Sequence, residues 1–173
     1  MSELSATNRR ILVIDDNLSI HDDFQRILAP VSTALDLDAE AAAILGEPPP
    51  ETVVAPTPFV LSFANQGEAG RDAVAMACQQ GEPFAMAFVD MRMPPGWDGL
   101  TTIRRIWDID PDLHIVICTA HSDRSWEDIA AALPERDRWA VLKKPFEKIE
   151  VTQLAHVMTA KWNLSRQLIG ATI

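Results

Sequence analysis

AFVDMRMPPGWDGL, residues 87–100, carries an apolar run to an aspartate and then turns through two prolines and two glycines. An apolar run of this kind predicts a buried strand that ends in Asp90. In an open parallel sheet, functional groups collect just beyond the carboxyl ends of the strands. Asp90 is therefore either a polar stop at the end of a strand or a nucleophile at the rim of a sheet.

The composition predicts one acidic globular domain. With 173 residues, 47% of them hydrophobic, and a formal net charge of -10, the chain can bury a core and would repel the phosphates of nucleic acids. The polar N-terminus MSELSATNRR leads directly into the short run ILVI, which predicts neither a secretory signal nor a membrane span. We expect a cytoplasmic protein without direct nucleic-acid or membrane binding. Cys78 and Cys118 stand in apolar surroundings and are expected to be reduced core thiols.

Apolar runs and helical patterns alternate along the chain. Apolar runs predict five strands, at residues 11–16, 59–64, 84–90, 114–120 and 139–144. Segments with helical spacing follow them, at 18–28, 67–81, 99–110, 125–133 and from about residue 147. Because parallel neighbours need crossover helices, this alternation predicts a parallel sheet covered by helices on both faces.

Residues 30–57 interrupt the alternation as an insertion between the first helix and the second strand. STALDLDAEAAAILG within it could form a short helix. The prolines of EPPPETVVAPTP block helix and central strand, which favours a solvated tether.

The last predicted helix has two apolar stripes. The core-facing stripe consists of Val151, Leu154, Ala155, Met158 and Trp162. Val157, Leu164 and Leu168 form a second stripe, which favours pairing with another copy or continuation into a further domain over a frayed end. We therefore expect a folded domain at 1–162 and a helical extension at 163–173 that is a linker to an output domain.

Polar groups follow four of the five predicted strands. Asp15 and Asp16 follow the first strand, and Asp90 ends the third. Thr119 lies at the end of the fourth strand and Lys144 at the end of the fifth. Singly, each could have an ordinary structural role, such as a cap of the first helix at Asp16 or Asn17 or a surface position for Lys144.

Together these groups predict phosphoryl chemistry. Three neighbouring carboxylates repel one another unless a cation lies among them, and hard oxygen ligands suit Mg²⁺. A carboxylate beside Mg²⁺ can attack a phosphoryl group, and the metal and Lys144 would neutralise the charge on its oxygen atoms. Thr119 is placed to donate a hydrogen bond to the new phosphoryl group.

Four motifs resemble the response-regulator receiver domain of bacterial two-component signalling. They are ILVIDDN, FVDMRMPPGWDG, ICTAHSD and LKKPF, and the resemblance spans residues 11 to about 160 apart from the insertion. It implies a flavodoxin-like, doubly wound sheet of five parallel strands in the order 2-1-3-4-5, with helices on both faces. It also implies a switching surface built from the fourth helix, the fifth strand and the fifth helix.

The same resemblance implies roles for individual residues. Asp90 would be the phosphoacceptor, and Asp15 and Asp16 would hold Mg²⁺ together with the backbone carbonyl of Arg92. The resemblance gives Thr119 a switch role and gives Lys144 a contact to the phosphoryl group. Arg92 and His121 would flank the path of the water that hydrolyses the acyl phosphate and would tune its lifetime; alternatively, they are two solvated polar side chains.

Three features depart from the family pattern. The loop MPPGWDG has an extra residue and places Trp97 where methionine is common, which leaves the path of the loop open. Val141 stands where the family commonly has an aromatic residue, whose ring moves together with the switch hydroxyl. The sequence therefore leaves open whether Thr119 moves together with a ring, and whether Trp139 supplies that ring. The spacing between Asp15 and Asp90 is longer than is typical, and the insertion at 30–57 accounts for the excess.

The resemblance implies that Asp90 accepts a phosphoryl group from a phosphohistidine donor, either a histidine kinase or a histidine phosphotransfer protein. No enzymatic activity is expected beyond self-phosphorylation and slow self-dephosphorylation. The alternatives are a Mg²⁺-dependent phosphatase with an aspartyl nucleophile and an interaction module that ignores phosphorylation. Receiver variants with the inserted crossover and PPGWDG resemble those joined to domains of cyclic-di-GMP turnover or to histidine kinases, and the last helix suggests a homodimer.

Overall fold

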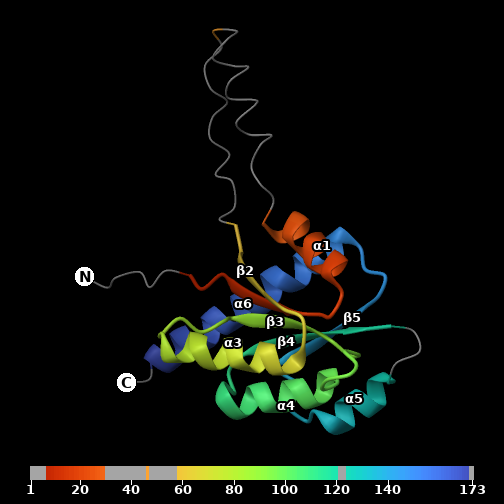
Figure 1. Ribbon diagram of the computed structural model, residues 1–173. Coiled ribbons are helices and arrows are strands. Elements are labelled where there is room, and N and C mark those ends of the chain that lie inside the picture. Colours follow the sequence, from red (N-terminus) through yellow and green to blue (C-terminus); the bar gives the residue numbers. More distant parts are fainter. Residues whose placement is uncertain (1–6, 30–45, 47–57, 121–123, 172–173) are drawn as a thin grey trace.

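A computed structural model describes residues 7–29, 46, 58–120 and 124–171 of the chain. Five parallel strands form one sheet in the order β2-β1-β3-β4-β5 (Figure 1). The strands are β1 (Arg10–Ile14), β2 (Val60–Ala64), β3 (Met86–Asp90), β4 (His114–Thr119) and β5 (Trp139–Lys143). The predicted parallel sheet and its order are confirmed.

Helices connect the strands and cover both faces of the sheet. The described helices are α1 (Leu18–Leu28), α3 (Gly67–Gln79), α4 (Gly99–Ile109), α5 (Trp126–Ala132) and α6 (Lys148–Ala171). Helices α1 and α6 pack on one face, and α3, α4 and α5 pack on the other (Figure 1). This arrangement confirms the flavodoxin-like, doubly wound fold.

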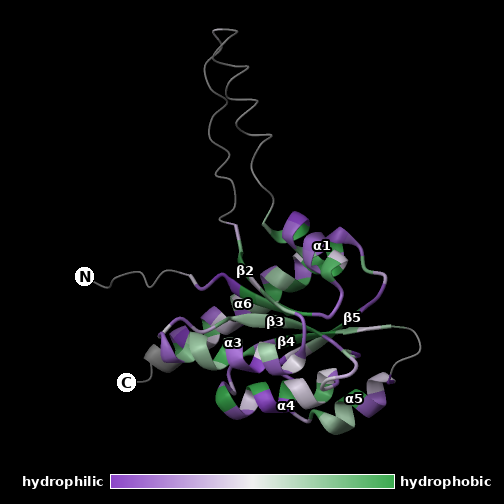
Figure 2. Ribbon diagram, in the orientation of Figure 1, coloured by the Kyte–Doolittle hydropathy of each residue, from purple (hydrophilic) through white to green (hydrophobic). Residues whose placement is uncertain are grey.

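The central strands are buried on both sides, which explains why their sequences are apolar throughout rather than alternating. In β1, Leu12 and Ile14 belong to the core beneath α3 and α4, whereas Ile11 and Val13 belong to the core beneath α1 and α6. Figure 2 shows hydrophobic residues concentrated in the strands and on the helix faces turned toward them. The protein therefore has two hydrophobic cores, one on each face of the sheet.

Helix α1 ends at Leu28, and β2 begins at Val60. The predicted insertion at 30–57 and its short helix lie outside the described residues, apart from Gly46. None of the helices in the described ranges is long and apolar enough to cross a membrane.

Helix α6 has the predicted core-facing stripe. Val151, Ala155, Met158 and Trp162 are buried, and Leu154 packs against them while partly exposed. The second stripe faces outward, with Val157 53%, Leu164 59% and Leu168 70% exposed. The helix continues without interruption across residue 162, and the boundary placed there remains a prediction.

The two cysteines are free thiols. Cys118 is buried in the sheet, and burial raises the pKa of its thiol. Cys78 is only partly buried, and its Sγ atom donates to Oδ2 of Asp110 at 3.7 Å. The core position predicted for the two thiols therefore fits Cys118 better than Cys78.

Candidate functional site

Three aspartates meet at the carboxyl edge of the sheet. Strand β1 ends at Ile14, so Asp15 and Asp16 are the first residues beyond it, and Asp90 is the last residue of β3. One carboxylate oxygen atom from each aspartate lies within 4.8 Å of the others. Asp15 is 2% and Asp90 8% exposed, whereas Asp16 is open to solvent.

Lys144 joins this cluster from the end of β5. Its backbone N–H donates to the carbonyl of Thr119 at 2.7 Å, which continues the pairing of β5 with β4. Its Nζ atom lies 2.9 Å from Oδ2 of Asp15 and 3.2 Å from Oδ1 of Asp90. The side chain is 23% exposed, so one partly buried ammonium is shared by two buried carboxylates.

The electrostatics of the cluster are unbalanced, with one ammonium against three acids. Burial, followed by the charge of Asp15, raises the pKa of Asp90 to about 6, although Lys144 opposes the shift. Burial disfavours the ammonium of Lys144, yet its hydrogen bond to Asp15 and the charges of Asp15 and Asp90 raise its pKa overall. The site therefore favours additional positive charge.

Asp15 is held by both of its carboxylate oxygen atoms. Oδ1 accepts the backbone N–H of Asn17 at 2.9 Å, and Oδ2 accepts from Lys144. Asn17, rather than Asp16, caps α1, because its side chain accepts the N–H of Ser19 at 3.0 Å. Asp16 is therefore not used as a helix cap.

His21 supports the same turn, a contact that the sequence did not indicate. Its Nε2 atom donates to the backbone carbonyl of Asp15 at 2.7 Å, and its ring stacks on Phe63 with centroids 5.0 Å apart. Nothing in the pattern LSIHDDF separates His21 from an ordinary surface residue of a helix. Its role is to position the backbone of Asp15.

The loop after Asp90 folds back against the strand end. The N–H of Met91 donates to the carbonyl of Cys118 at 3.0 Å, and the N–H of Gly99 donates to the carbonyl of Met91 at 2.8 Å. A Cβ atom on Gly99 would lie 2.7 Å from the carbonyl oxygen of Asp90. Only glycine lets the start of α4 pass this close to the aspartate.

The extra residue of the loop is accommodated around Trp97. The Pro94–Pro95 peptide bond is cis, and the side chain of Asp98 caps α4 by accepting the N–H of Thr101 at 2.8 Å. The guanidinium groups of Arg71 and Arg105 lie 5.3 and 5.7 Å from the centre of the Trp97 ring. The path of this loop, which the sequence did not predict, is thus fixed by a helix cap and by cation–π contacts.

Thr119 is 5% exposed at the end of β4, one residue beyond Cys118, which pairs with Asp90 in the sheet. A groove of about 1080 Å³ extends from Thr119 across Val141 to Trp126. The indole of Trp139 is buried, and its Nε1 atom donates to the carbonyl of Leu133 at 3.0 Å. Trp139 is therefore anchored in the core rather than placed as a mobile ring.

Arg92 and His121 are the two remaining predicted site residues. Arg92 lies two residues beyond Asp90 and is exposed. His121 lies outside the described residues. The structure thus brings together Asp15, Asp16, Asp90 and Lys144, with Thr119 at the end of the neighbouring strand.

The donor set fits a hard divalent cation. Its oxygen atoms come from three carboxylates, two of them buried, and they are close enough to share one ion. Among the residues that the structure describes, no sulfur or imidazole ligand belongs to this group. Such chemistry suits Mg²⁺ better than a softer transition metal.

Fold and site together define a flavodoxin-like α/β protein with three clustered carboxylates at the carboxyl edge of its sheet. The family model of the response regulator receiver domain matches residues 61–156, more than half of the chain. The chain belongs to this family. Receiver domains are generally non-enzymatic modules of phosphorylation-dependent signalling that bind Mg²⁺ at an aspartate cluster, and Asp15, Asp16 and Asp90 form such a cluster here.

Solved structures share the fold at low sequence identity. The adenylate cyclase structure from Rhodopirellula baltica is 20% identical, with a TM-score of 0.61, and the match covers 95% of this chain and 97% of that one. The signal receiver domain of an HD domain-containing protein from Pseudomonas fluorescens Pf-5 is 18% identical, with a TM-score of 0.63 and coverages of 95% and 96%. The CheY-like receiver domain protein from Methanospirillum hungatei JF-1 is 16% identical, with a TM-score of 0.60 and coverages of 91% and 98%. No curated protein matches the chain in sequence.

Proposed function

We propose that this receiver domain accepts a phosphoryl group on Asp90 from a phosphohistidine of a histidine kinase or a histidine phosphotransfer protein. One observation carries the proposal. Asp90 is a nearly buried carboxylate at the end of β3 that shares the ammonium of Lys144 with Asp15. This arrangement supplies a nucleophile together with charge to stabilise the transferred group.

The proposed reaction uses residues of the chain in distinct roles. A carboxylate oxygen atom of Asp90 attacks phosphorus, the phosphorus–nitrogen bond breaks with its electron pair going to the imidazole, and an acyl phosphate forms. Lys144, already 3.2 Å from Oδ1 of Asp90, contacts the transferred oxygen atoms, and Thr119 donates a hydrogen bond to them. Mg²⁺ held by Asp15, Asp16, Asp90 and the backbone carbonyl of Arg92 would offset the phosphoryl charge.

Transfer of label from a phosphohistidine donor tests this proposal. Wild type should become labelled only when Mg²⁺ is present, and Asp90→Asn should not become labelled. Asp108→Asn is a matched control because Asp108 is exposed near the carboxyl end of α4, whereas Asp90 is approached by Gly99 at the amino end of that helix. Equal labelling of wild type and Asp90→Asn would overturn the proposal.

Two rival functions make different predictions. A phosphatase with an aspartyl nucleophile usually has a second acid two residues later, where this chain has Arg92. Incubation with p-nitrophenyl phosphate should therefore release no product in multiple turnovers. An interaction module that ignores phosphorylation would show no Mg²⁺-dependent labelling at all.

The proposed switching surface comprises α5, β5 and α6. The groove of about 1080 Å³ on this surface reaches Thr119 at one end and has Trp126, Ile129 and Val157 among its walls. A shift of Thr119 toward a phosphoryl group on Asp90 would therefore act on the groove directly. Two states of this surface would differ in their affinity for a partner.

Arg92 and His121 are proposed to set the lifetime of the acyl phosphate. A guanidinium matches the geometry of phosphoryl oxygen atoms, so Arg92 would cover them and slow the attack of water. The rate of dephosphorylation of Arg92→Ala and His121→Ala tests this role. Unchanged lifetimes in both variants would remove it.

Similar structures motivate the proposed output. One is named as the signal receiver domain of an HD domain-containing protein, and another as the N-terminal domain of a response regulator/sensory box/GGDEF 3-domain protein. We propose an output domain of cyclic-di-GMP turnover or histidine kinase type and a homodimer through α6. The coding sequence downstream in the source genome tests the first part; absence of such a domain would contradict it. The cytoplasmic location remains a prediction.

A further inference from the structure

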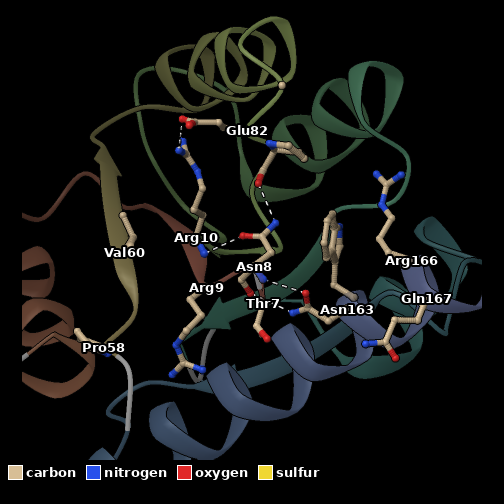
Figure 3. A pocket seen from close by; sticks show the side chains of 13 residues that line it. Thr7, Asn8, Arg9, Arg10, Pro58, Val60, Glu82, Asn163, Arg166 and Gln167 are labelled. Carbon is tan, nitrogen blue, oxygen red and sulfur yellow. Dashed lines mark hydrogen bonds and ion pairs between the residues drawn. The ribbon is translucent and has the colours of Figure 1, made fainter. Parts of the chain in front are cut away.

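A second hollow lies at the amino edge of the sheet, opposite the aspartate cluster. It measures about 870 Å³ and lies between the residues that lead into β1, the start of β2, the loop before β3 and residues 162–167 of α6. Figure 3 shows Arg9, Arg10 and Arg166 surrounding Asn8 and Asn163 at this place. None of these five residues belongs to the phosphoacceptor site.

Hydrogen bonds fix the floor of this hollow. The N–H of Asn8 donates to Oδ1 of Asn163 at 2.9 Å, and Nδ2 of Asn163 donates back to the carbonyl of Asn8 at 3.0 Å. The side chain of Asn8 also donates to the carbonyl of Pro83 at 2.9 Å (Figure 3). The asparagines satisfy each other, so they hold α6 to the sheet without filling the hollow.

Three residues of the walls each have a buried donor atom without an acceptor. Nε1 of Trp162 has no hydrogen-bond partner although the residue is only 8% exposed. Nε of Arg9 and Nε of Arg10 are likewise buried and without partners. Buried polar atoms are normally paired, because leaving one unpaired costs about 1–3 kcal/mol. All three are donors, so the missing partner is an acceptor.

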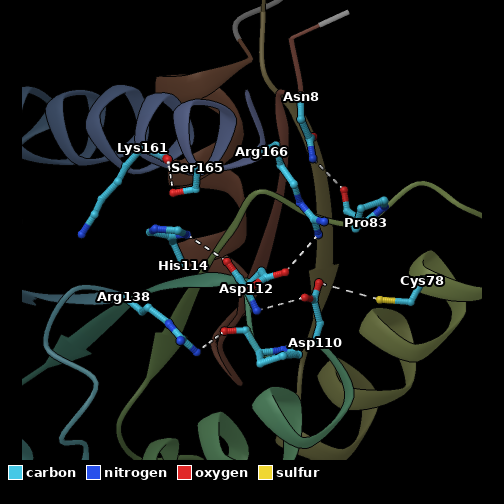
Figure 4. A network of polar contacts seen from close by, with 11 residues as sticks. Asn8, Cys78, Pro83, Asp110, Asp112, His114, Arg138, Lys161, Ser165 and Arg166 are labelled. Carbon is cyan, nitrogen blue, oxygen red and sulfur yellow. Dashed lines mark hydrogen bonds and ion pairs between the residues drawn. The ribbon is translucent and has the colours of Figure 1, made fainter. Parts of the chain in front are cut away.

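The charge of the walls is positive in a chain with a net charge of -10. Arg10 pairs with Glu82 at 2.8 Å, and Arg166 pairs with Asp112 at 3.3 Å (Figure 4). No carboxylate within the described ranges pairs with Arg9, whose guanidinium lies 4.1 Å from the centre of the Phe59 ring. The hollow therefore keeps one arginine whose charge is not neutralised.

We propose that this hollow binds a small anion that carries two or more carboxylate or phosphate groups. Carboxylate and phosphate oxygen atoms accept several hydrogen bonds each and match guanidinium groups. More than one anionic group is proposed because the unpaired Nε atoms belong to Arg9 and Arg10, whose side chains extend to different sides of Asn8 (Figure 3). The bound anion would join β1 to Trp162 and Arg166 of α6, and this site is independent of phosphorylation at Asp90.

Nuclear magnetic resonance of the full chain tests this site. The indole N–H resonance of Trp162, assigned by its loss in Trp162→Phe, is followed while citrate or pyrophosphate is added without Mg²⁺. A saturable shift is expected with at least one of them, and sodium chloride at equal ionic strength should not reproduce it. Citrate acting alone would identify carboxylates as the ligand class, and pyrophosphate acting alone would identify phosphates.

Variants separate specific binding from general screening. Arg9→Gln should weaken binding about tenfold, because one hydrogen-bonded charge is lost. Arg26→Gln makes the same change of charge on α1, where the side chain is 76% exposed, and should leave the affinity unchanged. Calorimetry should show that Trp162→Phe, which keeps a ring but removes the donor, also binds the anion more weakly than wild type. Equal affinity in wild type and Arg9→Gln, or a non-saturating shift that matches sodium chloride, would overturn the proposal.

Discussion

The Nζ atom of Lys144 lies 3.2 Å from Oδ1 of Asp90, so the end of β5 is tied to the end of β3 across the intervening strand β4. The same ammonium lies 2.9 Å from Asp15 at the end of β1. The ends of β1, β3 and β5 are therefore held together by the ammonium group of Lys144. Their geometry does not depend on a loop alone, because each group sits at or next to the end of a buried strand.

Lys144→Met should destabilise the protein at pH 7. Removing the ammonium leaves Asp15 and Asp90 buried beside each other without a counter-charge, and a loss of about 1–3 kcal/mol is expected for this partly exposed site. Lys143→Met is the matched control, since that side chain is exposed. Urea denaturation of both variants measures the difference, and equal midpoints would contradict the shared-charge account.

Stability without Mg²⁺ should fall as the pH rises from about 4 to about 6. The pKa of Asp90 is raised from 3.8 to about 6 in the folded chain, so the folded state holds a proton that the unfolded state releases. The unfolded state binds fewer protons than the folded state in this window. The free energy of unfolding therefore decreases as the pH rises. The effect is of order 1–3 kcal/mol, and thermal unfolding of wild type and Asp90→Asn measures it; parallel pH profiles would contradict it.

Mg²⁺ should restore this lost stability. The cation binds the ionised carboxylates and not the protonated ones, so the rise in melting temperature on adding Mg²⁺ should increase between about pH 5 and about pH 7. Asp90→Asn should show a smaller rise than wild type at pH 7. An equal rise in the melting temperature of both proteins would show that Mg²⁺ binds at a site that does not include Asp90.

Gly99→Ala should disturb the aspartate through the backbone. The added Cβ atom would lie 2.7 Å from the carbonyl oxygen of Asp90, and a loss of about 1–3 kcal/mol is expected from the forced shift. Gly96→Ala is the matched control, because its Cβ atom would meet the end of the Gln66 side chain, which can move. Denaturation midpoints and Mg²⁺ affinity should both change more in Gly99→Ala, and the reverse order would contradict the close-contact account.

Leu164→Arg should separate a dimer formed through α6. Leu164 is 59% exposed, so the substitution removes apolar contact surface without opening the core. Shortening the chain near residue 160 would be a poorer test, since Trp162 is buried and Asn163 bonds to Asn8. Leu18→Arg, at a leucine 68% exposed on α1, is the control. Light scattering should show a mass shift only in Leu164→Arg, and identical masses in all three proteins would defeat the dimer proposal.

Much of the fold could be predicted from the sequence because each central strand is a continuous apolar run. The runs that contain β1, β3 and β4 end in polar residues, and the positions of Asp15, Asp90 and Thr119 at one edge follow from parallel pairing. The strand order itself follows only from the family resemblance, because periodicity contains no information about neighbours.

The contacts that fix the site could not be predicted in this way. The contact of His21 with the Asp15 carbonyl depends on the direction of one side chain on α1. The close approach of Gly99 to Asp90 depends on the path of the loop, and a glycine after a proline turn is equally compatible with an open loop. The bonds between Asn8 and Asn163 join opposite ends of the chain, which no local pattern specifies.

The most direct measurement of the central proposal is the chemical location of the phosphoryl group. Wild type is phosphorylated with Mg²⁺ present and reduced with sodium borohydride, which converts a phosphorylated aspartate to homoserine, and its peptides are then analysed by mass spectrometry. The proposal predicts homoserine at position 90 in wild type and at no position in Asp90→Asn. Homoserine at another aspartate, or unmodified Asp90 in a labelled protein, would contradict it.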